Sequence, residues 1–204
     1  MSQPDGYPAG SAQPGQAPVL DTKLSWTRLY ADPQVITYGR QSIALDEVEW
    51  VSYWATHTAT KRALFPTTHD SEYHFDVGKY PYNGAQKIAV NDLSLGRPKD
   101  PPEFWTFLVN LSQRYLEPRL LAELVGRVRR GETVTVGGNI QVSQDSFACA
   151  ELKLSPQPWE SIIAESFDGM VWIYRAGAER ALITVPLSKP NAGLIPALFA
   201  TLTS

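Results

Sequence analysis

Alternating apolar and polar positions dominate the first part of the chain, and this pattern predicts short antiparallel strands. Strict alternation is typical of strands that bury one face. The longest such stretch, VEWVSYWATHT at 48–58, is dense in β-branched and aromatic residues, which favour strands. Asp-Pro and Asn-Gly turns separate these segments. The expected strands are 24–30, 35–39, 42–45, 48–58, 72–77 and 86–93.

The apolar spacing changes to a helical period after Asp100, which can cap a helix over 101–115. A second helix is expected to begin near Pro118 and to end at Gly131 in a left-handed cap. Strands then return, and Pro190-Asn191 begins a last amphipathic helix. The expected strands of this second part are 133–137, 140–143, 147–152, 159–166, 170–175 and 181–187.

Both halves therefore show the same order, in which several antiparallel strands precede a helix. ITYGRQSIA at 36–44 aligns without a gap with IQVSQDSFA at 140–148, and LDEV at 45–48 resembles WESI at 159–162. The sequence predicts an α+β fold with two bent antiparallel sheet or barrel halves, each closed by a C-terminal helix, and an extra helix between them. The expected divisions are a disordered Pro/Gly/Gln-rich tail (1–22), an N-terminal half (23–115), a linking helix (116–131) and a C-terminal half (132–204).

A motif series in the second half resembles a known family. GETVTVGG, SQDS, PWESI, DGMVWIY and PNAGLIPALFATL follow one another within 131–202, and they resemble the C-terminal half of bacterial pleckstrin-homology-like (PH-like) proteins of uncharacterised function. The family tends to place Gly in the turn where this chain has Ser146. The resemblance implies tandem PH-like halves and brings no catalytic residues with it.

Charge and composition narrow the classes of partner. The 204 residues carry a net charge of −3, so no global positive field favours nucleic acid, and we expect no nucleic-acid partner. The single cysteine, Cys149, indicates a reducing compartment. The most apolar stretch, 192–202, is too short to span a bilayer and contains Pro196, and no signal peptide is evident. We therefore expect a cytoplasmic protein without an integral membrane segment.

The segment HDSEYHFDVG at 69–78 holds two of the three histidines. On a strand, one face would carry a polar set and the other a set that becomes progressively apolar. A solvated polar face is one interpretation; the alternative is a metal site in which His74 is joined by His57 from another strand. No known metal-binding motif is present, so we expect no metal, no cofactor and no catalytic residues. The polar set is Asp70, Glu72, His74 and Asp76, and the other is His69, Ser71, Tyr73, Phe75 and Val77.

Aromatic and basic residues supply the candidate binding positions. KYPYNG at 79–84 is expected to form an exposed recognition loop, because Tyr and Trp are favoured at interfaces. A basic cluster near the end of the second helix either complements the helix C-terminus or binds an anionic ligand weakly. The candidate binding residues are Tyr80, Tyr82, Trp54, Arg127, Arg129 and Arg130.

These observations favour a non-enzymatic protein-binding or scaffolding module of PH-like fold. A sheet edge or an aromatic loop would take the protein partner, by strand addition at the edge. One alternative is a lipid- or small-ligand-binding protein that uses a pocket between the halves. A second alternative is a metal-dependent enzyme around His74 and His57.

Overall fold

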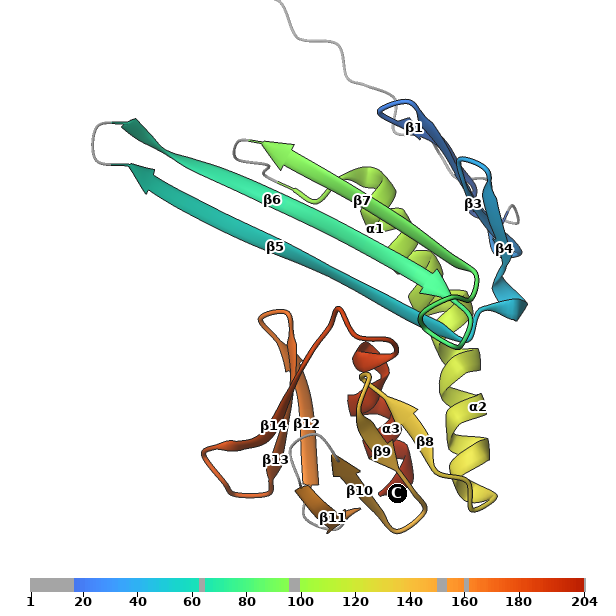
Figure 1. Cartoon of the computed structure of the whole chain (residues 1–204), viewed down its shortest axis with the longest axis vertical. Helices are drawn as coiled ribbons and strands as arrows, with labels where there is room; N and C mark the ends of the chain where they lie inside the picture. The colour runs from blue at the N-terminus through green and yellow to red at the C-terminus, as the bar shows by residue number, and fades with distance from the viewer. Residues whose placement is uncertain (1–16, 63–64, 96–99, 150–153, 160–161, 204) are drawn as a thin grey trace, which may run out of the picture.

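The fold is α+β and its sheets are antiparallel, as the sequence predicts. Four sheets and three α-helices are found in the described part of the chain, and the sheets remain separate rather than closing into a barrel. A four-stranded sheet, a three-stranded sheet and a helix follow one another, and the same series then repeats (Figure 1). The structure, a computed structural model, describes residues 17–62, 65–95, 100–149, 154–159 and 162–203.

The first sheet begins earlier than the sequence predicts. Strand β1 starts at Leu20, inside the expected disordered tail, where Asp21 forms a 2.6 Å ion pair with Arg28 of β2. The stretch 24–30 is a hairpin rather than one strand, because Ser25 has a φ of 54° and turns the chain. Residues 1–16 of the expected tail lie outside the described residues. The strands are β1 (Leu20–Leu24), β2 (Thr27–Ala31), β3 (Val35–Tyr38) and β4 (Gln41–Ala44), in that order.

A long, three-stranded sheet crosses the molecule (Figure 1). It comprises β5 (Trp50–Arg62), β6 (Phe65–Gly78) and β7 (Lys87–Leu95), with β5 at one edge. Among the described residues, pairing with β7 extends only to Asp70–Leu95, and the rest of the β5–β6 hairpin projects beyond this point as a two-stranded ribbon. A short 3-10 turn (Leu45–Glu47) leads into β5.

One helical run joins the two halves where the sequence predicts two helices. It consists of α1 (Glu103–Leu111), a π-helical turn (Ser112–Leu116) and α2 (Glu117–Arg129). Pro118 cannot donate a backbone hydrogen bond to the preceding turn, and the wider π turn ends at Leu116, two residues before it. The α1 segment contacts β6 and β1, whereas α2 contacts β8 and α3 of the second half. None of the helices in the described segments has the length and apolar surface needed to cross a bilayer.

The second half repeats the order of elements around its own aromatic cluster. Trp159 is 7% exposed and packs against Phe199 and Phe147, with ring centroids 4.8 and 5.9 Å away, and the two phenylalanine rings contact each other at 5.3 Å. Strand β11 was not expected, because its sequence LSPQP contains two prolines. Ser146 begins β10 and its φ is not positive, so the backbone at this position does not require the glycine that the PH-like family tends to have. The elements are β8 (Val134–Val136), β9 (Ile140–Val142), β10 (Ser146–Cys149), β11 (Leu154–Pro158), β12 (Ile162–Phe167), β13 (Met170–Arg175), β14 (Ala181–Pro186), a 3-10 turn (Ala192–Leu194) and α3 (Ile195–Leu202).

The residues that align between the two halves do not lie on equivalent strands. ITYGRQSIA at 36–44 covers β3 and β4, the third and fourth strands of their sheet. IQVSQDSFA at 140–148 covers β9 and the start of β10, the second and third strands of theirs. The matched segments are therefore offset by one strand, so the repeated order of elements rests on the topology and not on this alignment.

Candidate functional site

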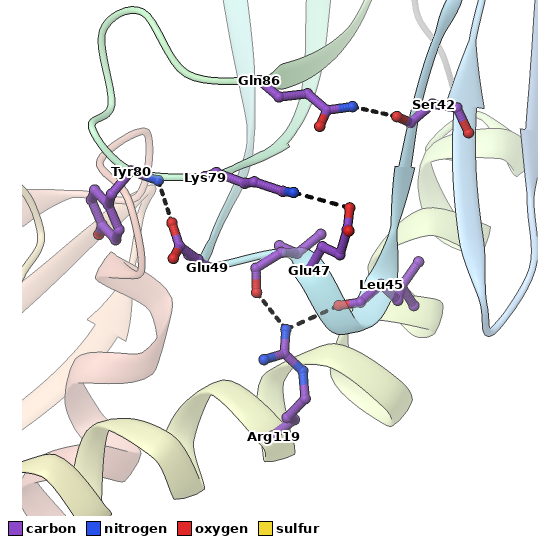
Figure 2. Close-up of polar contacts among 9 residues, drawn as sticks. Ser42, Leu45, Glu47, Glu49, Lys79, Tyr80, Gln86 and Arg119 are labelled. Atoms are coloured by element: carbon purple, nitrogen blue, oxygen red, sulfur yellow. Dashed lines mark hydrogen bonds and ion pairs between the residues drawn. The ribbon is translucent and has the colours of Figure 1, made fainter.

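The loop between β6 and β7, which contains KYPYNG, is held firmly against the connection between β4 and β5 (Figure 2). A hydrogen bond of 3.0 Å joins the two ends of the loop, from the Lys79 N–H to the Gln86 carbonyl. Three polar contacts then tie it to β4 and to the segment before β5: Lys79 Nζ with Glu47, the Tyr80 N–H with Glu49, and the Gln86 amide with the Ser42 carbonyl. Contacts within the chain therefore hold the predicted recognition loop in place.

Tyr82 lies on the buried ring of Trp50, with ring centroids 4.9 Å apart. The ammonium group of Lys87 is 5.7 Å from the Trp50 ring and 5.4 Å from the Tyr82 ring, within cation–π range of both. Trp50 also donates its indole N–H to the Lys79 carbonyl at 3.0 Å. Tyr82 is 39% exposed, so one part of its ring packs and the rest faces solvent.

Tyr80, the other tyrosine of the loop, is 45% exposed. Burial of its hydroxyl and the nearby Glu49 carboxylate raise the pKa of Tyr80 to about 12, while Asn191 and Arg127 oppose the shift. Tyr80 is therefore neutral at physiological pH. Two of the predicted binding residues, Tyr80 and Arg127, lie close enough to interact although they are far apart in the sequence.

The predicted basic cluster is mostly engaged within the chain. Glu132 accepts from Arg127 at 2.9 Å and from Arg130 at 3.1 Å, and both contacts hold the pKa of the Glu132 carboxyl below its usual range. Arg129 is exposed and forms no hydrogen bond or ion pair within the described segments. Gly131 has a φ of 86° and ends the helix as predicted. One unpaired arginine is a weak basis for an anion site.

The histidines predicted as an alternative metal site lie on opposite faces of the long sheet. His74 stacks on Trp54 with centroids 4.3 Å apart, on the face opposite α1, and its Nδ1 is 3.0 Å from the Asn91 amide oxygen. His57 pairs with Ser71 on the other face, where Nδ1 and Oγ are 2.7 Å apart. Over the residues that the structure describes, no group of three or more potential metal ligands occurs. His57 and His74 cannot bind one ion together.

The polar face predicted for β6 is solvated only in part. Glu72 is exposed, but Asp76 is 5% exposed and forms a 3.0 Å ion pair with Lys87. Asp76 is cross-strand from Ser52, which is also buried. The opposite face is apolar and buried from Tyr73 to Val77, as the alternation predicts.

Asn191, which precedes the last 3-10 turn, joins the second half to the start of β5. Asn191 adopts a left-handed conformation, with a φ of 58°, and is 1% exposed. Its amide oxygen accepts from the Val51 N–H at 3.0 Å, and its own N–H donates to the Val51 carbonyl at 2.8 Å. Its amide nitrogen donates to the Glu49 carbonyl at 3.0 Å. Asn191 therefore binds the start of β5 as a short piece of strand would.

A cavity of about 280 Å³ adjoins this contact, between the first half, the π turn and the second half. Its walls combine apolar side chains with a small polar group. It is lined by Val51, Ser52, Tyr53, Gln113, Glu117, Ser166, Leu187, Gly193 and Leu194.

The polar group of this junction cavity is centred on Glu117. Its Oε1 accepts from the Tyr53 hydroxyl at 2.8 Å and from the Ser112 hydroxyl at 3.1 Å. The Gln113 amide donates to the Tyr53 oxygen at 3.2 Å. Burial raises the pKa of Glu117, and burial together with the Glu117 charge raises the pKa of Tyr53. No basic side chain pairs with Glu117 in the described part of the chain.

The outer edge of β5 continues from this cavity. Because backbone groups alternate sides along an antiparallel strand, the outward position of the Val51 groups places those of four further residues on the same edge. In the described segments, no hydrogen bond from outside the sheet reaches these groups, and Thr56, His57, Thr58 and Ala59 are exposed. The four residues are Tyr53, Ala55, His57 and Ala59.

The structure thus separates the predicted binding residues and adds others. Tyr80 and Tyr82 share the fixed loop, whereas Trp54 lies farther along the hairpin. Asn191, Tyr53 and Glu117 were not among the predicted binding residues. Pro118, which directly follows Glu117 and predicts a break in the helix, was the sequence signal available for Glu117. Comparison of the chain with protein-family models, curated proteins and solved structures found no match, so function has to be inferred from this geometry.

Proposed function

We propose that the chain is a non-enzymatic protein-binding module that takes an extended segment of a partner protein on the free edge of β5. The proposal rests on the exposed edge of β5. Long, exposed edges present unpaired N–H and C=O groups that template another strand, and most proteins blunt them with charges or proline. Residues 55–60 of β5 read ATHTAT, with neither a charge nor a proline before Lys61.

The contact between Asn191 and Val51 supports this proposal. One residue already uses the outward N–H and C=O of β5, and it does so at the inner end of the strand. The next outward groups, from Tyr53 to Ala59, offer the same pattern of donors and acceptors. A bound strand would continue the sheet outward from the place where Asn191 ends it.

Exposed aromatic side chains lie on β12 and β13 of the second half. Phe167, at the end of β12, is 61% exposed and stacks on Trp172 at 5.4 Å, and Trp172 stacks on Tyr174 at 6.4 Å. Ser166, the residue before Phe167, lines the same cavity as Tyr53. Neighbouring residues of a strand point to opposite faces, so the stack lies on the other face of β12 from the cavity. Aromatic side chains are favoured in protein interfaces, and this exposed stack supports a protein-binding role in general.

The repeated series of a four-stranded sheet, a three-stranded sheet and a helix supports tandem PH-like halves as the architecture of the module. The buried, unpaired thiol of Cys149 supports a reducing compartment, and we propose a cytoplasmic location. Neither Arg129, the member of the basic cluster that has no partner in the described segments, nor the separated histidines favours the anion-binding or metal-enzyme alternatives.

Proline substitution on β5 tests the proposal. Ala55→Pro and His57→Pro each remove an outward N–H and leave the ladder with β6 intact, because proline is tolerated where the N–H faces away from the sheet. Peptides selected from a display library of unstructured sequences by binding to the native chain should lose affinity for both variants. His57→Ala, which keeps the N–H, should bind them normally.

Amide exchange supplies the second readout of this experiment. Bound peptide should slow exchange at the Ala55, His57 and Ala59 amides. Selection of no peptide, or of peptides that bind both proline variants as well as the native chain, would refute the proposed function. A melting temperature for each variant establishes that the binding site is folded.

A further inference from the structure

We infer that the junction cavity is a specificity pocket for a lysine or arginine side chain of the segment bound on β5. This inference rests on the proposed function, and it names the chemistry of the partner. The cavity is placed where the free edge of β5 begins, because Val51 and Tyr53 belong both to its wall and to that edge.

The charge of the pocket selects a cation. Glu117 lies at the junction, and its known contacts are hydrogen bonds from Tyr53 and Ser112, both neutral groups. The nearest arginines on the same helical run are used elsewhere: Arg114 lies over the Tyr115 ring, and Arg119 donates to the Leu45 and Val48 carbonyls (Figure 2). A half-buried carboxylate without a counter-ion favours a cationic ligand, because the ion pair would compensate its lost hydration.

The shape and the apolar wall suit a long basic side chain. Val51, Leu187 and Leu194 supply the surface along which an aliphatic stem would lie, while its charged head reaches Glu117. A volume of about 280 Å³ is just below the roughly 300–1,000 Å³ of pockets for drug-sized ligands. It suits one side chain better than a whole cofactor.

The π turn gives this arrangement its geometry. Ser112 and Gln113 belong to the turn and Glu117 follows it directly, so the widened turn brings all three toward Tyr53. Single π turns within α-helices are rare and are found frequently at functional sites.

A separate partner fits the site better than a second copy of this chain. Antiparallel pairing of two β5 edges about His57 would place Lys61 of one copy opposite Tyr53 of the other, which supplies a basic residue. However, the whole β5–β6 hairpin would then have to enter the space bounded by Ser166, Leu187 and Leu194, where a single extended strand needs half the width. We therefore assign the site to a single strand of another protein.

The test uses the selected peptides and a small probe. The peptides should contain Lys or Arg near the end that lies at Tyr53, and replacing it by norleucine or citrulline should weaken binding about 10- to 100-fold. Glu117→Gln should produce the same loss for the basic peptide and little change for the neutral one. Butylguanidinium should shift the NMR signals of the residues that line the cavity in the native chain, and butylurea should not.

The outcomes separate the two proposals. Peptides that lose affinity for His57→Pro but bind equally with citrulline would overturn the specificity pocket and leave strand addition in place. Peptides indifferent to His57→Pro would overturn both. A dimer in sedimentation equilibrium that dissociates on Lys61→Ala would assign the edge to a second copy and overturn the separate partner.

Discussion

Asn191 and Val51, which are 140 residues apart, hold each other by two hydrogen bonds: Val51 N–H to Asn191 Oδ1 at 3.0 Å, and Asn191 N–H to the Val51 carbonyl at 2.8 Å. The pair couples the second half of the chain to the edge strand of the first. It also marks the inner limit of the edge that we propose as the binding surface.

Asn191→Ala should lower the free energy of unfolding by about 2–4 kcal/mol. The change removes two side-chain hydrogen bonds and places a Cβ-bearing residue without a local polar side chain at a positive φ. Asn191→Gly is the matched control, because glycine accepts the φ of 58° and loses only the amide. Urea denaturation should show a smaller loss for Gly than for Ala; equal losses would mean that the backbone conformation contributes nothing.

Trp159→Ala should destabilise the chain by about 3–5 kcal/mol, since a buried aromatic ring leaves a large cavity. Trp159 is 7% exposed, and its indole N–H donates to the Gln144 carbonyl at 3.0 Å. Trp26→Ala deletes the same atoms at a position that is 97% exposed, and it should change stability by less than about 0.5 kcal/mol. Comparable denaturation midpoints for the two variants would show that Trp159 is not a core residue.

Gly78→Ala should cost about 1–3 kcal/mol through overpacking. A Cβ built at Gly78 would lie 2.6 Å from Trp50 Cζ2 and 2.8 Å from the Gln86 carbonyl oxygen, which is backbone and cannot move aside easily. Gly126→Ala, within α2, should instead stabilise the chain by about 0.5–1 kcal/mol, because alanine favours the helix and the new Cβ would meet only the flexible end of Arg130 at 3.5 Å. Thermal melts of both variants test this opposite sign.

Glu117→Gln should raise the melting temperature at neutral pH. Burial raises the pKa of Glu117 in the folded chain, so the folded state binds the proton more tightly than the unfolded state does. The stability from that proton is fully present below the unfolded pKa and is lost as the pH rises through the folded pKa. Native chain and variant should therefore differ most above the folded pKa.

Thermal unfolding of both proteins at a series of acidic pH values tests the direction of this difference. The advantage of Glu117→Gln should shrink as the pH falls and should disappear below the ordinary glutamate pKa of about 4.3. An advantage that stays constant with pH would show that the carboxylate charge is not its origin. A gain in stability together with a loss of binding to basic peptides would be typical of a functional site.

Alternation along β6 determined which face is buried, because one face of a strand must be apolar to pack. Tyr73, Phe75 and Val77 were predictable for this reason. The opposite face was predicted as solvated, but Asp76 is buried beside Lys87 because strand register brought a cation within 3.0 Å. Register is a pairing between segments, and the pattern of one strand does not contain it.

Turns and helix ends were only partly predictable from the sequence. Gly131 was predictable as a helix cap, since a positive φ after a basic last turn favours glycine. Ser25 turns the chain between β1 and β2 without such a signal, so one strand was predicted where there are two. Likewise, Pro118 predicted a break in the helix, whereas the π turn allowed the helix to continue.

The sequence alone determined the α+β class, the alternation of buried positions and the helix that ends at Gly131, because these depend on the period and type of neighbouring residues. Tertiary structure decided where the candidate site lies. Glu117, Tyr53 and Asn191 come from the helical run, from β5 and from the segment before α3, and each has an ordinary local sequence. Their place in the candidate site depends on contacts between segments as much as 140 residues apart, and no local sequence pattern encodes such contacts.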